Sequence, residues 1–473
     1  MPVMFRWVGA LRLFLILMAL LTAIFVPVVV SGYLEVSQGE TAAAHQQYGS
    51  AAEYYRSAAL KLPWKTGLWE QVAVVEVRAG NAAAAIPIYE SLRRHGLLSA
   101  SGWEIYGAIY NAKGDTQESL NTWLAGFSAY PSHMRFCYLI SAAYGQLGEF
   151  RAQRAWLERW VATGHADAPD HFGLGLLLMT TDPAGARLQL TQAASMDAAF
   201  KPAVRTLDAS LDLAAAQPDV SRRLVILGRG LGLVSQWPLA AAAFEQAVQA
   251  DGANGEAWAW LGEARQQAGQ DGKQPLDQAL ALSPKDTLVH ALRGLYWKRQ
   301  ADYQQALAEY RTAAELEPAN PEWQAALGDS YTLAGDLVSA LAAYRQATTL
   351  APQSVTYWRL LALFCADNSV QVLDVGLPAA KQAAELAPND PDVLDALGWS
   401  FAQAGLLYNA EQTLIKATDL APRSALTHFH LAETFLLKGD QASALRELTL
   451  TNQLDPEGPT GKLAGQIIKQ YFP

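Results

Sequence analysis

His428 and His430 are the residues of this chain whose type and spacing first suggest chemistry. Two imidazoles close together could bind a metal ion or transfer a proton. On a helix, however, residues two positions apart point in different directions, and no carboxylate cluster in the sequence is placed to join them. We therefore interpret the pair as ordinary variation within a helix and predict neither a metal site nor a catalytic site.

Motifs of nucleotide, metal and redox chemistry are also missing from the sequence. It contains no Gly-x-x-x-x-Gly-Lys-Ser/Thr phosphate loop, no Cys-x-x-Cys pair and no His-Glu-x-x-His. Its two cysteines, Cys137 and Cys365, lie far apart, which is typical of buried small residues and not of a disulfide framework. We expect a protein that is not an enzyme and needs no cofactor. The net charge of −10 also argues against a nucleic-acid partner, which would require a basic stripe.

A regular spacing of prolines reveals the elements that position these residues. Six prolines follow one another at steps of 34, 34, 36, 34 and 34 residues: Pro284, Pro318, Pro352, Pro388, Pro422 and Pro456. Each proline ends an Ala- and Leu-rich run. A period of 34 residues predicts one helical hairpin copied many times, and therefore a solenoid.

Small residues recur in fixed columns between these prolines. Gly294, Gly328 and Gly398 each lie 24 residues before the following proline, and alanines occupy two further columns. Antiparallel helices can approach closely only where side chains are small, and bulky neighbours then fill the space beside the contact. Glycine followed by an acidic residue, as at Gly335-Asp336, is typical of the turn between the two helices.

This pattern resembles the tetratricopeptide repeat (TPR), whose signature is Trp-x-x-Leu-Gly-x-x-Tyr followed by Ala, an aromatic residue, Ala and Pro. Residues 258–262 match its opening and residues 327–331 match its continuation. The resemblance implies an all-α fold, a right-handed superhelical solenoid of antiparallel helix pairs. Copies are expected to start near residues 66, 100, 134, 168, 221, 255, 287, 321, 355, 391 and 425, and most tryptophans fall in core columns of these copies, including Trp69, Trp103, Trp258, Trp297 and Trp358.

Irregularities in the period suggest how the chain is divided. We expect an N-terminal array at 32–201, an extra helix or seam at 202–220, a C-terminal array at 221–458 and a capping helix at 459–473 that covers the last apolar face. A second irregularity, near 369–376, inserts two residues and replaces the usual short turn.

The N-terminal segment reads as a membrane anchor. Residues 13–30 carry no charge and are long enough, with their flanks, to span a bilayer, so we expect a transmembrane helix at 13–31. Arg6 and Arg12 precede the segment, whereas Glu35 and Glu40 follow it. This bias predicts a single-pass protein with a cytoplasmic stub at 1–12 and an extracytoplasmic repeat region, periplasmic or extracellular. We favour an uncleaved signal anchor; the alternative is cleavage after Gly32 and a secreted form.

Candidate binding residues follow from the TPR resemblance. Members of that family usually hold partners along the concave face built by the first helix of each pair. The Lys and Asn clamp by which some members hold acidic chaperone tails is absent, since Ala325 and Asp329 stand at two of its positions. The candidate groove residues are Tyr138, Phe172, Arg222, Arg229, Lys298, Arg359, Trp399 and Phe429.

Three functions are consistent with these observations. The first is a membrane-tethered, non-enzymatic scaffold that assembles or positions partner proteins of the cell envelope. The second is a module that binds envelope glycan or peptide through exposed groove aromatics such as Trp399 and Phe429. The third is an accessory subunit of a glycosyltransferase or polymer-export system, as some bacterial anchored TPR proteins are. The sequence identifies no individual partner.

Overall fold

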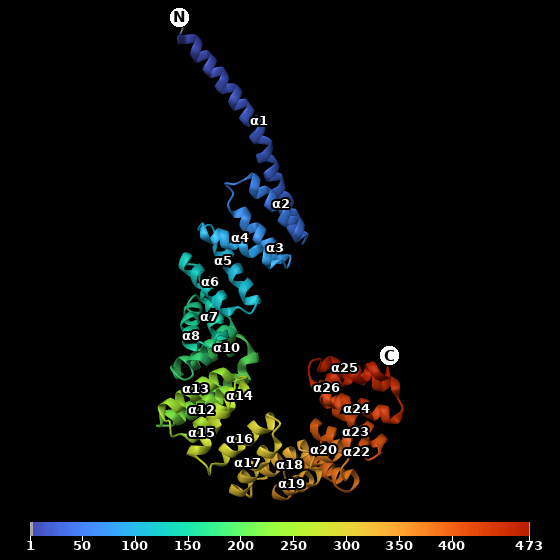
Figure 1. The fold of residues 1–473 in the computed structure, drawn as a ribbon. Helices are drawn as coiled ribbons and strands as arrows, with labels where there is room; N and C mark the ends of the chain where they lie inside the picture. Colours follow the sequence, from blue (N-terminus) through green and yellow to red (C-terminus); the bar gives the residue numbers. More distant parts are fainter. Residues whose placement is uncertain (1–2, 473) are drawn as a thin grey trace. The chain divides into compact units, whose positions relative to one another are not determined.

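The computed structural model describes the backbone of residues 3–472 and side chains from Phe14 onward. The described residues form α-helices and contain no strand (Figure 1). The all-α solenoid of helix pairs predicted from the sequence is therefore confirmed. Residues 1 and 2 of the predicted stub, and the side chains of all of its residues, lie outside the described part.

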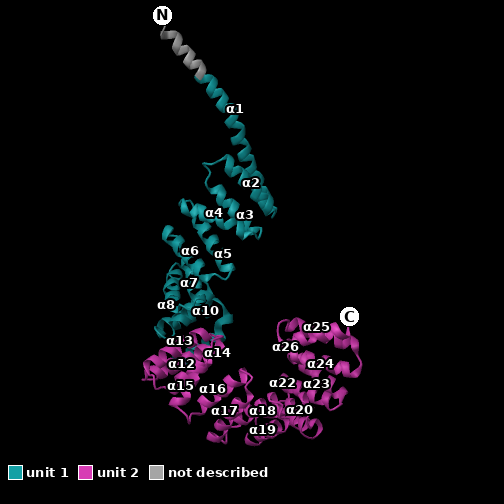
Figure 2. Cartoon of the chain, in the orientation of Figure 1, with its two compact units in different colours: residues 1–212 teal, residues 213–473 magenta. Residues whose placement is uncertain are grey.

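The chain separates into two compact units, residues 1–212 and 213–473 (Figure 2). The division falls within α11 (Lys201–Ala215), in the region that the sequence singles out as irregular. Unit 1 otherwise contains α1 (Val3–Ala44), α2 (Tyr48–Lys61), α3 (Gly67–Arg78), α4 (Ala82–Arg94), α5 (Ala100–Ala112), α6 (Thr116–Ala129), α7 (Arg135–Gln146), α8 (Phe150–Val161), α9 (Ala168–Leu178), α10 (Pro183–Met196) and the short 3₁₀ turn η1 (Ala198–Phe200).

Unit 2 continues the series of helix pairs. It contains α12 (Val220–Leu233), α13 (Trp237–Ala250), α14 (Gly255–Gln267), α15 (Lys273–Leu282), α16 (Thr287–Arg299), α17 (Tyr303–Leu316), α18 (Pro321–Leu333), α19 (Leu337–Leu350), α20 (Val355–Asp367), η2 (Val372–Gly376), α21 (Leu377–Leu386), α22 (Pro391–Gln403), α23 (Leu407–Leu420), α24 (Ala425–Lys438), α25 (Gln441–Leu454) and α26 (Pro459–Tyr471).

We call the first helix of each repeat the A helix and the second the B helix. The A helices are α3, α5, α7 and α9 in unit 1 and α12, α14, α16, α18, α20, α22 and α24 in unit 2. Each begins within one residue of a repeat start expected from the sequence. The period of the small and large columns is therefore sufficient to locate the hairpins.

The glycine column marks the closest contact between A and B helices. A Cβ atom added at Gly328 would lie 2.9 Å from the ring of Tyr344 on the B helix, and one at Gly294 would lie 2.7 Å from the ring of Tyr310. Ala340 and Ala306 on the B helices are fully buried beside these contacts. Forcing a larger side chain into such a packed contact typically costs about 1–3 kcal/mol.

Side-chain hydrogen bonds fix two A helices, α14 and α20, to the turns before them. The Nε1–H groups of Trp258 and Trp358 donate to the carbonyl oxygens of Gly252 and Pro352, six residues earlier, at 2.9 and 2.8 Å. These tryptophans also pack against the core clusters of their repeats. Their structural role explains why aromatic residues recur in this column without forming a ligand platform.

The two cysteines are buried, as the sequence suggests. Cys137 and Cys365 are fully inaccessible to solvent and are not bonded to each other. Burial raises the pKa of both thiols, that of Cys365 to about 11. Both side chains are therefore neutral, unreactive parts of the core.

The irregularity at 369–376 is a rebuilt turn. Ser369 and Gln371 adopt positive φ angles of 55° and 43°, and the π-helical turn η2 follows them. Gly376 lies against Cys365, since an added Cβ would come within 2.6 Å of the cysteine Cβ. The two inserted residues are thus absorbed in the turn, and α21 still packs on α20.

The first helix differs from the sequence expectation in its length. Instead of ending near residue 31, α1 continues without interruption through Ala44, and Pro27 lies inside it. Its second half packs against α2, with Gly32 facing Leu62 and Gly39 facing Tyr55. The anchor segment and the first helical hairpin therefore share one helix, because no residue between 31 and 44 ends it.

The last helix covers the end of the solenoid. Ala464 of α26 is fully buried against Phe429, Ala432 and Leu448, and Ile468 packs on the same cluster. The predicted cap at 459–473 corresponds to this helix.

Deleting residues 459–473 should expose this cluster. We expect a loss of about 2 kcal/mol or more in the free energy of unfolding, since several apolar side chains become solvated. Self-association should increase as well. Denaturant unfolding and light scattering of the full chain in detergent would measure both effects. Leu463→Ala is a suitable control because Leu463 is largely exposed; a truncated chain that stays monomeric with unchanged stability would contradict the assignment.

Candidate partner-binding face

The A helices of unit 2 line one face of the array. Four successive pairs of A helices pack on one another, namely α12 on α14, α14 on α16, α20 on α22 and α22 on α24, whereas no pair of B helices in the described residues packs comparably. Helices that converge on one side and diverge on the other produce a curved array with the A helices inside (Figure 2). We call the surface formed by α12, α14, α16, α18, α20, α22 and α24 the A face.

Ion pairs connect successive A helices in the first half of this face. The Arg299 guanidinium on α16 donates two hydrogen bonds to the Glu263 carboxylate on α14, at 2.7 and 2.8 Å. Lys298 lies 3.3 Å from Asp329 on α18, and Asp329 also accepts a 2.6 Å hydrogen bond from the Tyr344 hydroxyl. Because Glu263 is buried, the two-pronged arginine contact fixes the angle between α14 and α16.

Aromatic and acidic groups connect the second half of the face. The indole N–H of Trp399 on α22 donates to Asp367 on α20 at 2.8 Å. The same indole stacks on the His430 ring of α24, with ring centroids 4.6 Å apart and planes 4° from parallel. His430 in turn lies 3.0 Å from the buried carboxylate of Asp395. Trp399 is therefore the central link of three successive A helices.

Partial desolvation changes the acidity of two groups here. It raises the pKa of Asp367, even though the bond from Trp399 opposes the shift and the residue stays open to solvent at the end of α20. It also raises the pKa of Glu433, which makes no hydrogen bond to another described side chain. The nearby His430 lowers the pKa of both carboxyl groups, but less than desolvation raises it.

The predicted groove residues fall into three groups in the structure. Exposed residues are Tyr138, Arg222 and Arg229, and partly buried residues are Phe172, Lys298 and Arg359. Trp399 and Phe429 are buried, with only 7% and 6% of their surface exposed. The expectation that these two rings are exposed is wrong: Trp399 stacks on its neighbours, and Phe429 lies beneath the cap helix α26.

The exposed and partly buried members differ in their surroundings. Arg229 lies 3.7 Å from Glu256 and covers the ring of Trp260 at 5.2 Å. Arg222 and Arg359 form no ion pair with another described residue. In unit 1, the Tyr138 ring lies 5.9 Å from that of Trp160, and the Phe172 ring 4.8 Å from that of Phe200. Arg222 and Arg359 are thus the arginines of the predicted set whose charge has no ionic partner among the described residues, and Arg222 is also exposed.

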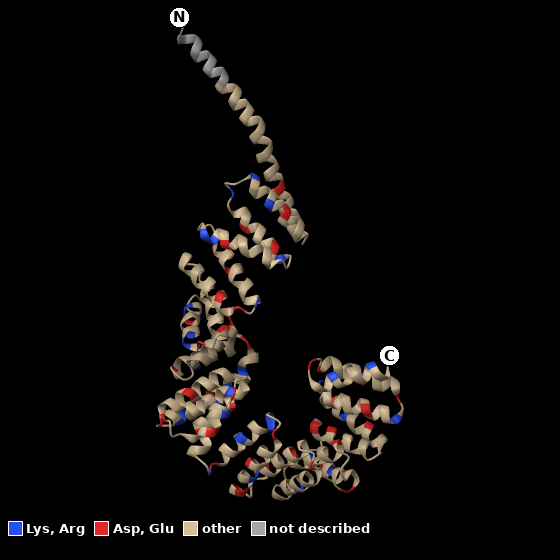
Figure 3. Cartoon of the chain, in the orientation of Figure 1, with Lys and Arg blue, Asp and Glu red and all other residues tan. Residues whose placement is uncertain are grey.

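Charges of both signs are interspersed along the two units (Figure 3). Lys and Arg positions lie among Asp and Glu positions on the helices of both units.

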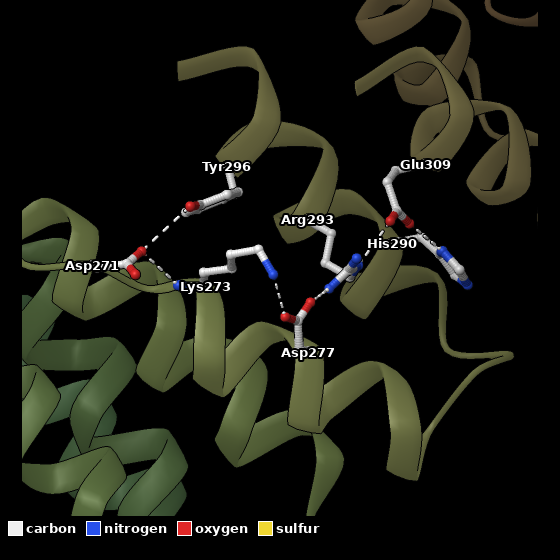
Figure 4. A network of polar contacts seen from close by, with 7 residues as sticks. All are labelled: Asp271, Lys273, Asp277, His290, Arg293, Tyr296 and Glu309. Carbon is white, nitrogen blue, oxygen red and sulfur yellow. Dashed lines mark hydrogen bonds and ion pairs between the residues drawn. The ribbon is translucent and has the colours of Figure 1, made fainter. Parts of the chain in front are cut away.

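A partly buried polar network between α15, α16 and α17 was not foreseen from the sequence (Figure 4). Arg293 donates to Asp277 at 2.5 Å and to the buried Glu309 at 2.7 Å, while His290 also contacts Glu309 at 2.7 Å. Partial burial raises the pKa of Asp277, but hydrogen bonds from Lys273 and Arg293 outweigh it and lower the pKa overall. Every charge in the network has a partner, which indicates a structural role and not a reactive site.

His428 repeats the contacts of His290 four repeats later. Its Nδ1 lies 2.6 Å from Glu447 and its Nε2 lies 3.2 Å from the Pro422 carbonyl oxygen, as His290 contacts Glu309 and the Pro284 carbonyl. His428 and His430 each meet a carboxylate that the sequence did not reveal, because Glu447 is 19 residues from His428 and Asp395 is 35 residues from His430. The two carboxylates belong to different helices. In the part of the chain that the structure describes, no group of three or more His, Cys, Asp or Glu side chains is placed to hold a metal ion.

The His428 contact predicts a pH effect. The hydrogen bond that His428 donates to the Glu447 carboxylate raises the pKa of His428 above its ordinary value of 6.5. The pair therefore stabilises the fold fully below pH 6.5, and this contribution is lost as the pH rises through the pKa of the folded state. Glu447→Gln should lower the free energy of unfolding by about 1 kcal/mol below pH 6.5 and much less at alkaline pH.

Denaturant unfolding over a pH series would measure this difference. Glu457→Gln is the matched control, because the Glu457 side chain is almost fully exposed. An effect of Glu447→Gln that is equal at every pH, or that grows as the pH rises, would contradict the assigned role of the pair.

Comparison with known proteins identifies the repeats. A family model described as "Tetratricopeptide repeat" matches residues 73–133, 228–287 and 292–355. No curated protein matches the chain.

Several solved structures are similar in fold. Yeast Tom70 has 14% sequence identity and a TM-score of 0.42, with 93% of this chain and 95% of that chain covered. The Cut9 and Hcn1 hetero-tetramer of the APC/C gives 14% identity and a TM-score of 0.43, covering 92% and 95%. The pilF protein of Pseudomonas aeruginosa has 18% identity and a TM-score of 0.36, covering 46% of this chain and 98% of its own.

Proposed function

We propose that this chain, in which residues 73–133, 228–287 and 292–355 match the tetratricopeptide repeat, is a non-enzymatic scaffold that binds partner proteins along the A face. The repeats supply an extended curved surface, which is the usual binding surface of solenoids. In this proposal the helix α1 tethers the scaffold to a membrane, and the repeats assemble or position proteins of the cell envelope.

The observation that carries the binding proposal is the pairing pattern of the A face. Glu263, Asp329 and Asp395 are committed to bonds between A helices, whereas Arg222 and Arg359 have no ionic partner among the described residues. A surface whose internal charges are already paired is held in shape before binding, which lowers the entropic cost of association. The two arginines would then donate to carboxylate or carbonyl oxygens of the bound protein.

The tether proposal is supported by the exposure of α1. It is the one helix among the described residues that is long and apolar enough to cross a membrane. Side chains such as Phe14, Ile16 and Ile24 are more than half exposed and have no protein to cover them. Cleavage after Gly32 would also remove Ser31, which bonds Lys61, and would break the contact of α1 with Leu62. These contacts favour an uncleaved anchor.

The burial of Trp399 and Phe429 weakens the envelope-glycan alternative. A sugar platform requires exposed aromatic faces, and these two rings are enclosed. An accessory role in a glycosyltransferase or polymer-export system remains a special case of the scaffold and would be recognised by the identity of the partner.

Site-specific photo-crosslinking in cells tests the binding face. A photoreactive amino acid at Arg222 or Arg359 should capture the same partner protein. The matched control is Val338 on the B helix α19, which is 83% exposed and should capture nothing specific. Arg222→Glu combined with Arg359→Glu should weaken binding of the captured partner at least tenfold, since two charge-assisted bonds become repulsive. Equal capture at Val338, or unchanged affinity of the double variant, would contradict a partner on the A face.

A reporter fused after residue 473 tests the topology. The charge bias around α1 predicts that the reporter is active outside the cytoplasm. The control fusion lacks residues 1–32 and should be active only inside. Cytoplasmic activity of the full-length fusion would overturn the proposed localisation.

A further inference from the structure

The start of the first hairpin is fixed against α1 by close packing. Leu62, which follows α2, is fully buried, and its side chain occupies the space beside Gly32, where an added Cβ would lie only 2.8 Å from Cγ. About two turns further along α1, Tyr55 occupies the space beside Gly39. These two contacts set the height of α2 along α1, so the residues after α2 cannot slide away from the apolar segment.

This packing places the end of α2 alongside the apolar half of α1. An open hollow of about 350 Å³ lies between them. Its apolar lining comes from Phe25, Val28 and Val29 of α1 and from Leu60, Pro63 and Trp64. Phe25 and Val29 precede Gly32 by seven and three residues. The hollow therefore lies roughly 5–10 Å from Gly32 along the helix axis, toward the N-terminus of α1. The first charged residue that follows the apolar segment, Glu35, comes only after Gly32.

The surface of residues 60–65 combines apolar, aromatic and basic groups. Leu60 and Trp64 are 71% and 58% exposed, which leaves large apolar side chains uncovered. Lys61 bonds Ser31 Oγ at 3.0 Å and pairs with Glu35, while the Lys65 ammonium lies 4.3 Å above the Tyr33 ring. Tryptophan and tyrosine collect where a bilayer meets water, and lysines there extend their ammonium groups toward the polar side.

We propose that residues 60–65 are a second membrane contact, inserted into the headgroup and acyl boundary of the bilayer that α1 crosses. This inference rests on the proposed tethering by α1. If the apolar segment of α1 lies in the hydrocarbon, Leu60 and Trp64 lie at the depth of Phe25 and Val29, because these residues line the same hollow. The first hairpin, formed by the second half of α1 and by α2, then contacts the bilayer surface directly and is not held by the membrane-spanning helix alone.

Depth-dependent quenching tests the contact in the full chain. Single variants Leu21→Cys, Trp64→Cys and Leu188→Cys carry an environment-sensitive fluorophore, and the protein is reconstituted in phosphatidylcholine vesicles with or without lipids brominated on the acyl chain. Leu21 reports the proposed span, and Leu188 on α10 is an exposed control of unit 1. The native cysteines are fully buried and stay unlabelled under native conditions. Trp64 and Leu188 are both surface residues, so both replacements leave the core intact.

Bromolipid should quench the label at residue 64 at least twofold more than that at residue 188, and the label at residue 21 most strongly. Quenching at 21 with none at 64 above the control would overturn the second contact and leave the tether in place. No quenching at either 21 or 64 would overturn both proposals. Leu60→Cys provides an independent second position, for which the same outcomes are expected.

Discussion

The close approach of A and B helices at the small-residue column is the constraint on which the rest of this structure depends. Gly294 and Gly328 allow the tyrosine rings of Tyr310 and Tyr344 to lie directly on the A-helix backbone. Each ring then closes one hairpin, and the hairpins stack because their remaining apolar sides are still exposed. The same contact recurs about every 34 residues. The alternation of small and large side chains within one repeat therefore determines the packing of the whole array.

The A face follows from that constraint, because curvature brings the A helices together and leaves their polar side chains facing one another. The chain uses this proximity in two ways. Around α14, α16 and α18 it places ion pairs, including the contact of Arg299 with Glu263. Around α20, α22 and α24 it stacks Trp399 on His430. Both arrangements fix neighbouring repeats relative to each other, so the surface offered to a partner is held in shape by the residues that line it.

Sequence periodicity predicted the hairpins well, since the columns of glycine, alanine and proline report contacts within one repeat. It could not predict contacts between repeats. The family positions indicate that Trp399 faces the groove, but its burial depends on Asp367 and His430, which lie 32 and 31 residues away and are not part of the repeat signature. The enclosure of Phe429 depends in the same way on α26, which belongs to no repeat. The position of a residue within the repeat therefore predicts which way its side chain points. How far that side chain is exposed depends on the neighbouring repeats.

The continuity of α1 shows the same limit at the other end of the chain. A hydropathy pattern marks where apolar residues stop, but the helix continues through Ala44 because nothing in residues 31–44 breaks it. The helix thus serves two environments, with an exposed apolar half and a second half packed on α2. A joint of this kind has no flexible linker. Any force that a partner exerts on the first hairpin would be transmitted to the segment in the proposed membrane through the contacts of Gly32 with Leu62 and of Lys61 with Glu35.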